Sequence, residues 1–230
     1  MRIEVLADAD AVAGKAAAII AAEARKAVAA HGRFTIAVSG GRTPWVMLRA
    51  LAGEEVPWPH VHVFQVDERV APEGHPDRNL THLREALHRA ALPAVQIHAM
   101  PVEIPDLSAA AAKYSAELEK VVGAPAVLDL VHLGLGPDGH TASLVPGDPV
   151  LDVTDRDVAA TGVYQGRNRL TLTYPIINRA RLILWLVTGA EKMPMYTRLC
   201  AADKSIPAGR VLQEHALLLA DNAACEGNIE

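Results

Sequence analysis

The sequence predicts an α/β fold, with a Rossmann-like, mainly parallel sheet, helices on both faces and a small antiparallel extension. Short apolar runs that suit buried strands alternate along the chain with longer segments of helical pattern. With 230 residues and 50% hydrophobic content, the chain can bury a full core. No linker or change of composition marks a boundary, so we expect a single domain over residues 1–230. A possible hairpin within residues 158–173 predicts the antiparallel extension.

The apolar runs share the composition of buried strands, because most of them are rich in Val, Ile and Leu. The turn at 165–168 separates the two runs of the expected hairpin. In chain order, strands are expected at residues 3–6, 34–38, 61–66, 95–99, 128–135, 158–163, 169–173, 182–187 and 216–219.

The segments between these runs predict helices with recognisable ends. Either Asp8 or Asp10 can cap an alanine-rich helix that ends near Gly32. Asn79 is a candidate cap for a helix that runs to Arg89. The other helices are expected at residues 45–51, 108–122, 190–201 and 207–215.

Charge and cysteine usage restrict the partners and the setting. A net charge of -5 and a pI near 6.1 argue against a broad nucleic-acid or anionic-membrane surface. The first ten residues lack the pattern of a secretion signal, and no apolar stretch reaches membrane-spanning length. The two cysteines form no CxxC pattern. We therefore expect a cytoplasmic protein, monomeric or homodimeric, with no nucleic-acid or membrane partner.

The stretch LGLGPDGHTASLVPG at 133–147 predicts the centre of a functional site. An apolar strand leads into a glycine-rich loop, in which Gly139 permits a positive φ angle. Asp138 and His140 then lie at the carboxyl end of a strand, where open α/β sheets bind ligands. An imidazole, with an unperturbed pKa of about 6.5, suits proton transfer near neutrality. His140 is thus the candidate base, and Asp138 can orient its ring.

Other interpretations of this region fit less well. Its GxGxxG spacing is also found in dinucleotide sites, but prolines crowd the segment where the long helix should begin. Ser143 lacks the GxSxG elbow of a serine nucleophile. His60, His62 and His132 could be imagined as zinc ligands, although such histidines are more often hydrogen-bonded strand residues. We expect neither a metal nor a cofactor.

The segment SGGRTP at 39–44 predicts an anion site. A strand, a Gly-Gly turn and a proline near a helix start expose backbone N–H groups and the helix dipole to an anion. The alternative is an ordinary tight turn in which Ser39 or Thr43 caps the helix. The spacing and lysine of a P-loop are missing.

Two further positions offer local positive charge. Arg69, in Asp67-Glu68-Arg69, can fork two hydrogen bonds onto a phosphate, with Asp67 holding it or contacting sugar hydroxyls. The alternative is a solvated strand end. Lys192, in the first turn of the helix expected at 190–201, can serve an anion at that helix end or be an ordinary surface lysine. Together these positions indicate a phosphorylated, hydroxyl-rich substrate such as a sugar phosphate.

The chain resembles the 6-phosphogluconolactonase family in five ordered motifs, which span most of its length. They are SGGRTP at 39–44, VDERV at 66–70, LGLGPDGHTASLVPG at 133–147, RLTLTYPIIN at 169–178 and TGAEK at 188–192. The resemblance implies the fold shared with glucosamine-6-phosphate deaminase and ribose-5-phosphate isomerase. It also implies hydrolysis of 6-phospho-D-glucono-1,5-lactone to 6-phosphogluconate in the oxidative pentose phosphate pathway, without a metal.

The resemblance further implies roles for individual residues. His140 is implied to activate water, with Asp138 and Asp67 as polar partners in the pocket. The residues implied to bind the substrate or its phosphate are Ser39, Gly40, Gly41, Thr43, Arg69, Asn79, Arg169 and Lys192. Arg42 and Arg78 stand where the family often has small residues, and either can add a phosphate contact or point to solvent.

Two alternatives remain. An aminosugar-phosphate deaminase or sugar-phosphate isomerase is the nearer one, but the corresponding deaminase loop resembles GHIAFNEPG and supplies a glutamate, whereas Val145 precedes Pro146 here. The other is a non-catalytic sugar-phosphate sensor. Regulators of that kind carry a DNA-binding segment before the sensor, and this sequence begins with an expected strand and helix of the core.

Overall fold

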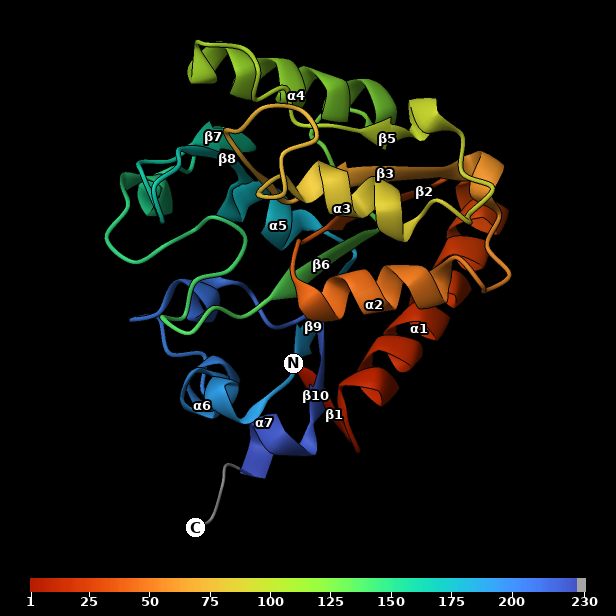
Figure 1. Ribbon diagram of the computed structural model, residues 1–230, viewed down its shortest axis with the longest axis vertical. Coiled ribbons are helices and arrows are strands. Elements are labelled where there is room, and N and C mark those ends of the chain that lie inside the picture. The colour runs from red at the N-terminus through yellow and green to blue at the C-terminus, as the bar shows by residue number, and fades with distance from the viewer. Residues whose placement is uncertain (227–230) are drawn as a thin grey trace.

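Seven parallel strands form the main sheet of the computed structural model, which describes residues 1–226 (Figure 1). A second, antiparallel sheet has three strands, and the two sheets confirm the expected fold class. The spatial order of the main sheet is β1 (Arg2–Leu6), β10 (Ala216–Asp221), β9 (Leu182–Val187), β6 (Leu130–Gly134), β2 (Phe34–Val38), β3 (Val61–Gln65) and β5 (Ile97–His98). The small sheet has the order β4 (Asp67–Arg69), β8 (Arg169–Leu172) and β7 (Val158–Ala160).

Helices cover both faces of the main sheet, so each strand is buried on two sides. In β9, Leu184 and Leu186 pack into the core beneath the first three helices, while Ile183 and Trp185 pack into the opposite core. The first face carries α1 (Ala9–His31), α2 (Arg42–Leu51) and α3 (Asn79–Ala86). The remaining helices are α4 (Leu107–Val122), α5 (Tyr174–Arg179), α6 (Met193–Cys200) and α7 (Asn222–Glu226).

The ends of α1 follow the sequence signals. The carboxylate of Asp8 accepts a hydrogen bond from the N–H of Ala11 at 2.8 Å, so Asp8 and not Asp10 is the cap. Gly32 ends the helix with a φ of 82°. The bounds expected for β2 and β9 are also those observed.

Several expected elements are shorter than the sequence indicated. The helix expected at 207–215 is a single 3-10 turn, Pro207–Arg210, because the backbone becomes extended at Val211, with φ -70° and ψ 134°. The helix expected at 190–201 is a 3-10 turn, Ala190–Lys192, followed by α6, whose second residue is a proline. Helix α3 ends at Ala86 rather than Arg89, β5 has only two residues, and β7 ends at Ala160.

The strand expected at 61–66 is divided between the two sheets. Val66 lies between β3 and β4, where its N–H donates to Val38 and its carbonyl accepts from Leu172. The chain thus leaves the parallel sheet and enters the antiparallel one at this residue. Asp67 and Arg69 consequently belong to the small sheet, which lies beside the carboxyl ends of the main strands.

The topology sets the place of a ligand site. Strand β3, which follows β2 in the chain, lies on one side of β2. Strand β6 lies on the other side of β2, and β9 and β10 come after β6 in the sheet. Open α/β sheets bind ligands at the carboxyl ends of strands where the order reverses in this way. No helix within residues 1–226 is long and apolar enough to cross a membrane.

Candidate active site

A cavity of about 540 Å³ opens at the carboxyl ends of β2, β6 and β9. Its volume lies in the range of small-molecule sites. Every residue implied by the family resemblance lines this cavity except Asp138, which lies behind His140 and contacts its ring. Segments separated by up to about 150 residues in the sequence therefore meet around one space.

The loop after β6 fixes the orientation of His140. Nδ1 of His140 lies 2.5 Å from Oδ1 of Asp138, which also accepts the backbone N–H of His140 at 3.1 Å. A Cβ at Gly136 would overlap the imidazole, so the ring packs directly on the glycine backbone. Gly139 has a φ of 83°, as its place in the turn predicts. No helix opens within residues 133–147, which is contrary to a dinucleotide motif.

The contact with Asp138 indicates which ring nitrogen of His140 is free to accept a proton. A carboxylate accepts hydrogen bonds, so Nδ1 of His140 carries a proton and Nε2 is left unprotonated in the neutral ring. Burial raises the pKa of Asp138, but hydrogen bonds and charge from His140, with a further hydrogen bond from Tyr164, bring it below its ordinary value. Asp138 is therefore charged at neutral pH.

Asp67 occupies a different position from the one expected beside Arg69. Its Oδ2 accepts a hydrogen bond from Ser143 Oγ at 2.6 Å and lies 3.8 Å from Nη1 of Arg169. Its Oδ1 accepts from the amide of Asn79 at 3.2 Å. Arg69 instead donates from Nη1 to the carbonyl of Asp77 at 2.8 Å, although Asp67 and Arg69, two residues apart on β4, share a face of the strand. The expectation that Asp67 holds Arg69 is wrong.

Arg69 and Arg169 form the positive side of the cavity. They are register partners across the antiparallel pair β4 and β8. The Nε atoms of both guanidinium groups are buried and have no hydrogen-bond partner among the described residues. Burial lowers the pKa of Arg169, and the charge of Asp67 opposes this effect. Both residues line the cavity, and two neighbouring guanidinium groups are suited to a dianion such as a phosphate.

The Gly-Gly turn also lines the cavity and is held in place by β6. Ser39 donates its backbone N–H to Nδ1 of His132 and its hydroxyl to the His132 carbonyl. Gly41 is the N-cap of α2, and no side chain of residues 1–226 caps this helix. The alternative in which Ser39 or Thr43 caps α2 is therefore wrong. Thr43 Oγ1 instead lies 2.7 Å from Thr188 Oγ1. The first residues of α2, Arg42 and Thr43, line the cavity.

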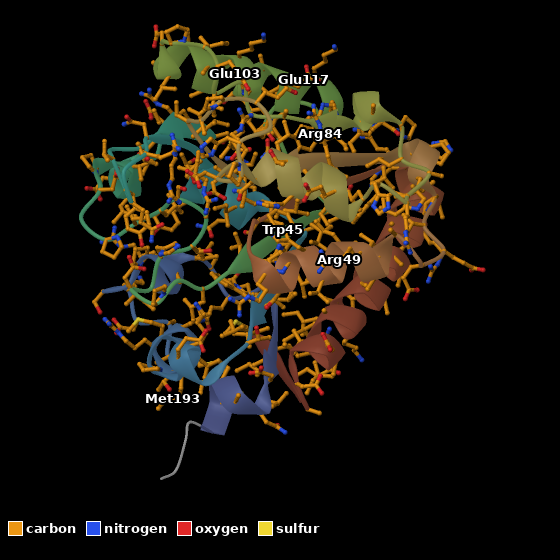
Figure 2. The ribbon with its side chains drawn as sticks, viewed as in Figure 1. Trp45, Arg49, Arg84, Glu103, Glu117 and Met193 are labelled. Atoms are coloured by element: carbon orange, nitrogen blue, oxygen red, sulfur yellow. The ribbon has the colours of Figure 1, made fainter. Side chains whose placement is uncertain are left out.

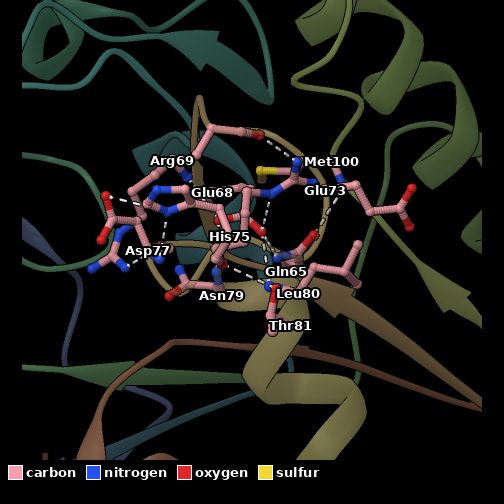
Figure 3. Close-up of polar contacts among 12 residues, drawn as sticks. Gln65, Glu68, Arg69, Glu73, His75, Asp77, Asn79, Leu80, Thr81 and Met100 are labelled. Atoms are coloured by element: carbon pink, nitrogen blue, oxygen red, sulfur yellow. Dashed lines mark hydrogen bonds and ion pairs between the residues drawn. The ribbon is translucent and has the colours of Figure 1, made fainter.

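Asn79 does not cap α3, contrary to expectation. It is the first residue of α3, and its side chain points to Asp67 and against Gly40, where a Cβ would overlap its amide. The carboxylate of Glu68 accepts the N–H groups of Asn79 and Leu80 at 2.8 Å each. Glu68, which lies on strand β4, is thus the cap of α3 (Figure 3).

Of the remaining basic residues, Lys192 and Arg42 line the cavity and Arg78 does not. Lys192 is the N-cap of α6 rather than a first-turn residue, and it lines the cavity. Arg42 begins α2 and also lines the cavity. Arg78 does not line this cavity, because its buried guanidinium is paired with Glu68 at 3.2 Å and Glu103 at 2.6 Å.

The histidines considered as zinc ligands do not converge. Burial lowers the pKa of His132 to about 3, so this ring is a neutral acceptor for Ser39. His62 lies 3.0 Å from His98. Across residues 1–226, no group of three histidine, cysteine or acidic side chains could hold a metal.

The sequence analysis missed Tyr164 as a site residue. Its hydroxyl donates to Oδ2 of Asp138 at 3.1 Å, and its ring lies beside that of His140. Nothing in the motif around Asp138 signals this contact, since Tyr164 belongs to the expected turn region of the hairpin.

Known proteins share both the sequence and the fold. Residues 7–219 match the family described as "Glucosamine-6-phosphate isomerases/6-phosphogluconolactonase". The chain is 39% identical to a 6-phosphogluconolactonase from Nostoc sp. over 94% of this chain and 93% of that protein. It is 41% identical to one from Synechocystis sp., over 83% and 81% of the two chains.

A solved structure agrees with these relatives. The crystal structure of 6-phosphogluconolactonase from Thermotoga maritima superposes with a TM-score of 0.85 at 28% identity, covering 96% of this chain and 98% of the other. The motifs at the strand ends, the cavity they surround and the match over nearly the whole length agree. The chain belongs to the glucosamine-6-phosphate isomerase/6-phosphogluconolactonase family.

Proposed function

We propose that this protein hydrolyses 6-phospho-D-glucono-1,5-lactone to 6-phospho-D-gluconate, the lactonase step of the oxidative pentose phosphate pathway. Relatives named 6-phosphogluconolactonase match it at 39–41% identity over most of its length. The observation that carries the assignment of roles is that His140, oriented by Asp138, shares one cavity with Arg69, Arg169 and Lys192. A base and a cluster of cations can thus act on the two ends of one small molecule.

In the proposed mechanism His140 acts first as a base and then as an acid. Nε2 takes a proton from water, and the resulting hydroxide attacks the lactone carbonyl carbon. The tetrahedral intermediate collapses by breaking the bond between the carbonyl carbon and the ring oxygen. The imidazolium returns its proton to that oxygen, which becomes a hydroxyl, and the new carboxylic acid ionises. Asp138 stabilises the imidazolium between the two proton transfers.

The phosphate end of the substrate is assigned to the arginine pair and the Gly-Gly turn. Arg69, Arg169 and Lys192 line the cavity and supply positive charge, and the N-terminus of α2 offers backbone N–H groups. Ser39, Gly40, Gly41 and Thr43 shape that turn, and Asn79 packs against it. Asp67 is held by Ser143 and Arg169, from where it can accept hydrogen bonds from sugar hydroxyls.

The deaminase alternative requires a glutamate before Pro146, and this chain has none there. Val145 stands before Pro146, and its side chain is buried and outside the cavity lining. A non-catalytic sensor is disfavoured by the arrangement of His140 and Asp138. Binding alone has no need of an imidazole whose tautomer is fixed by a carboxylate.

Acid release from freshly generated 6-phosphogluconolactone, corrected for spontaneous hydrolysis, tests the assignment. Glucosamine 6-phosphate is the comparison substrate, with ammonia release as the readout. We expect rapid acid release from the lactone and no ammonia from the aminosugar. Ammonia release without lactone hydrolysis would support the deaminase alternative, and binding of either sugar phosphate without turnover would support a sensor.

The cellular location and the oligomeric state of the protein remain predictions. We propose a cytoplasmic protein, supported by its two free cysteines, Cys200 and Cys225. A monomer or homodimer is expected, and light scattering of the purified protein would distinguish them.

A further inference from the structure

Tyr164 lies at the tip of the β7–β8 hairpin but turns inward from it. The N–H and carbonyl of Tyr164 pair with the carbonyl and N–H of Arg167 at 2.9 and 3.2 Å. Between them, Gln165 and Gly166 have φ angles of 52° and 79°, the pattern of a tight hairpin turn with two left-handed residues. Val163, next to Tyr164, is 69% exposed, whereas Tyr164 is only half-buried and reaches the candidate base.

The hydroxyl of Tyr164 completes the hydrogen bonding of the Asp138 carboxylate. Oδ1 of Asp138 is occupied by His140, whose ring nitrogen and backbone N–H both point to it. Oδ2 accepts the hydroxyl of Tyr164 at 3.1 Å, and the same hydroxyl lies 3.4 Å from Nδ1 of His140. Burial and the charge of Asp138 raise the pKa of Tyr164, so the hydroxyl keeps the proton that it donates.

The ring of Tyr164 also joins the base to the cationic side of the cavity. Its edge contacts the imidazole of His140, with centroids 5.4 Å apart and an interplanar angle of 67°. The Cζ atom of Arg169 lies 4.9 Å from the centroid of the Tyr164 ring. Arg169 is only 4% exposed and donates to Ser143 and Gln165, so it is a fixed surface for the ring.

The hairpin tip is itself anchored on the opposite side. Arg167 donates from Nε to the Asp77 carboxylate at 2.7 Å and from Nη1 to the Val70 carbonyl at 3.3 Å. The turn is therefore tied to the loop that follows β4. An anchored turn can hold the phenol at a fixed distance from Asp138, as positioning of a catalytic group requires.

We propose that Tyr164 is a positioning residue for lactone hydrolysis, whose hydroxyl fixes the Asp138 carboxylate and thereby aims Nε2 of His140 into the cavity. The inference rests on the proposed role of His140 as the base. Tyr164 touches neither substrate nor water in this role. It acts through Asp138, so its removal should change turnover and leave substrate binding intact.

Tyr164→Phe tests this proposal, because it removes the hydroxyl and keeps the ring between His140 and Arg169. Because the lost hydrogen bond is to a charged group, we expect kcat to fall roughly 10-fold to 100-fold with KM unchanged. The unsatisfied carboxylate should hold the imidazolium more strongly, which moves the acid limb of the kcat profile to higher pH. Val163→Ala, an exposed change on the same hairpin, should leave kcat, KM and the pH profile as in the wild type.

A double-mutant cycle with Asp138→Asn shows whether the hydroxyl acts through the carboxylate. In that background Tyr164→Phe should cause little further loss, because the two changes disable one unit. Wild-type kcat and pH profile in Tyr164→Phe, or an undiminished loss in the Asp138→Asn background, would overturn the inference. Thermal unfolding of each variant checks that the fold persists. If the wild-type chain itself fails to hydrolyse the lactone, the proposed function fails, which is a separate outcome.

Discussion

Arg69 and Arg169 face each other as register partners across β4 and β8, and both present buried, unpaired Nε atoms among the residues described. Like charges directly opposite on neighbouring strands destabilise a sheet. Asp67 offsets part of this repulsion through its ion pair with Arg169. We propose that a bound phosphate offsets the rest.

Replacing Arg69 should therefore harm the phosphorylated substrate selectively. A charge-assisted hydrogen bond contributes roughly 1.5 to 3 kcal/mol, so Arg69→Ala should lower kcat/KM by roughly 10-fold to over 100-fold. The comparison is 6-phosphogluconolactone against unphosphorylated gluconolactone. Arg49→Ala, on the exposed side of α2 (Figure 2), is the matched control. An equal loss with both lactones would mean that Arg69 does not recognise phosphate.

Gly40 should tolerate no side chain, because a Cβ there would overlap the amide of Asn79. Gly40→Ala should displace that amide from Asp67 and raise KM for the phosphorylated lactone by about 10-fold, the effect of one lost hydrogen bond of about 1.4 kcal/mol. Gly14→Ala is the control, since Gly14 lies within α1 and has free space around it. It should stabilise the fold by about 0.5–1 kcal/mol without changing kinetics. If Gly40→Ala had the same kcat and KM as Gly14→Ala, the contact between Gly40 and Asn79 would not matter for substrate binding.

Asp138→Asn should change both the rate and its pH dependence. The amide can donate to Nδ1 and so favour the wrong tautomer, which lowers kcat by roughly 10²- to 10⁴-fold. Because the pKa of Asp138 is below its ordinary value, the wild-type carboxylate is charged throughout the neutral range and favours the imidazolium. Its removal disfavours protonation of the ring, so the acid limb should move to lower pH. A limb that stays in place would show that Asp138 does not act on the titrating base.

His132 should make the fold sensitive to acid. Burial lowers its pKa to about 3, below the unfolded value of about 6.5, so the unfolded chain binds the extra proton between these pH values. This contribution to stability is complete above about pH 6.5 and is lost as pH falls, by up to about 1.4 kcal/mol per pH unit. His62 and His98 act in the same direction, because burial lowers their pKa values too.

Urea unfolding at several pH values checks this prediction. His132→Asn keeps an acceptor for the Ser39 N–H and removes the titrating ring, so its stability should depend less on pH than that of the wild type. Equal slopes for the two proteins between about pH 6.5 and 4 would contradict the assignment of the acid sensitivity to His132.

Most candidate residues named from the sequence line one cavity, because strand ends and glycine turns are local signals. The runs at 34–38 and 182–187 contain mostly apolar residues and were predicted with their observed bounds. His140 and Asp138 are two residues apart, so their pairing depends on one short turn. The parallel topology then brings the separate strand ends to one edge of the sheet.

The partners of those residues could not be predicted in the same way. Glu68 caps α3 from 11 and 12 residues away and is fully buried, although a charge at a strand end normally suggests solvent exposure. Asp67 meets Ser143, and Tyr164 meets Asp138, only after the second sheet has formed. Each pairing depends on tertiary structure that no local pattern encodes.

The most direct test of the account is the turnover of His140→Ala with authentic 6-phosphogluconolactone. We expect kcat to fall roughly 10²- to 10⁴-fold because the general base is lost, while KM and the unfolding temperature change little. His60→Ala, an exposed histidine outside the cavity, is the control and should keep wild-type turnover. Near-normal turnover in the folded His140→Ala protein would contradict the proposed mechanism at its centre.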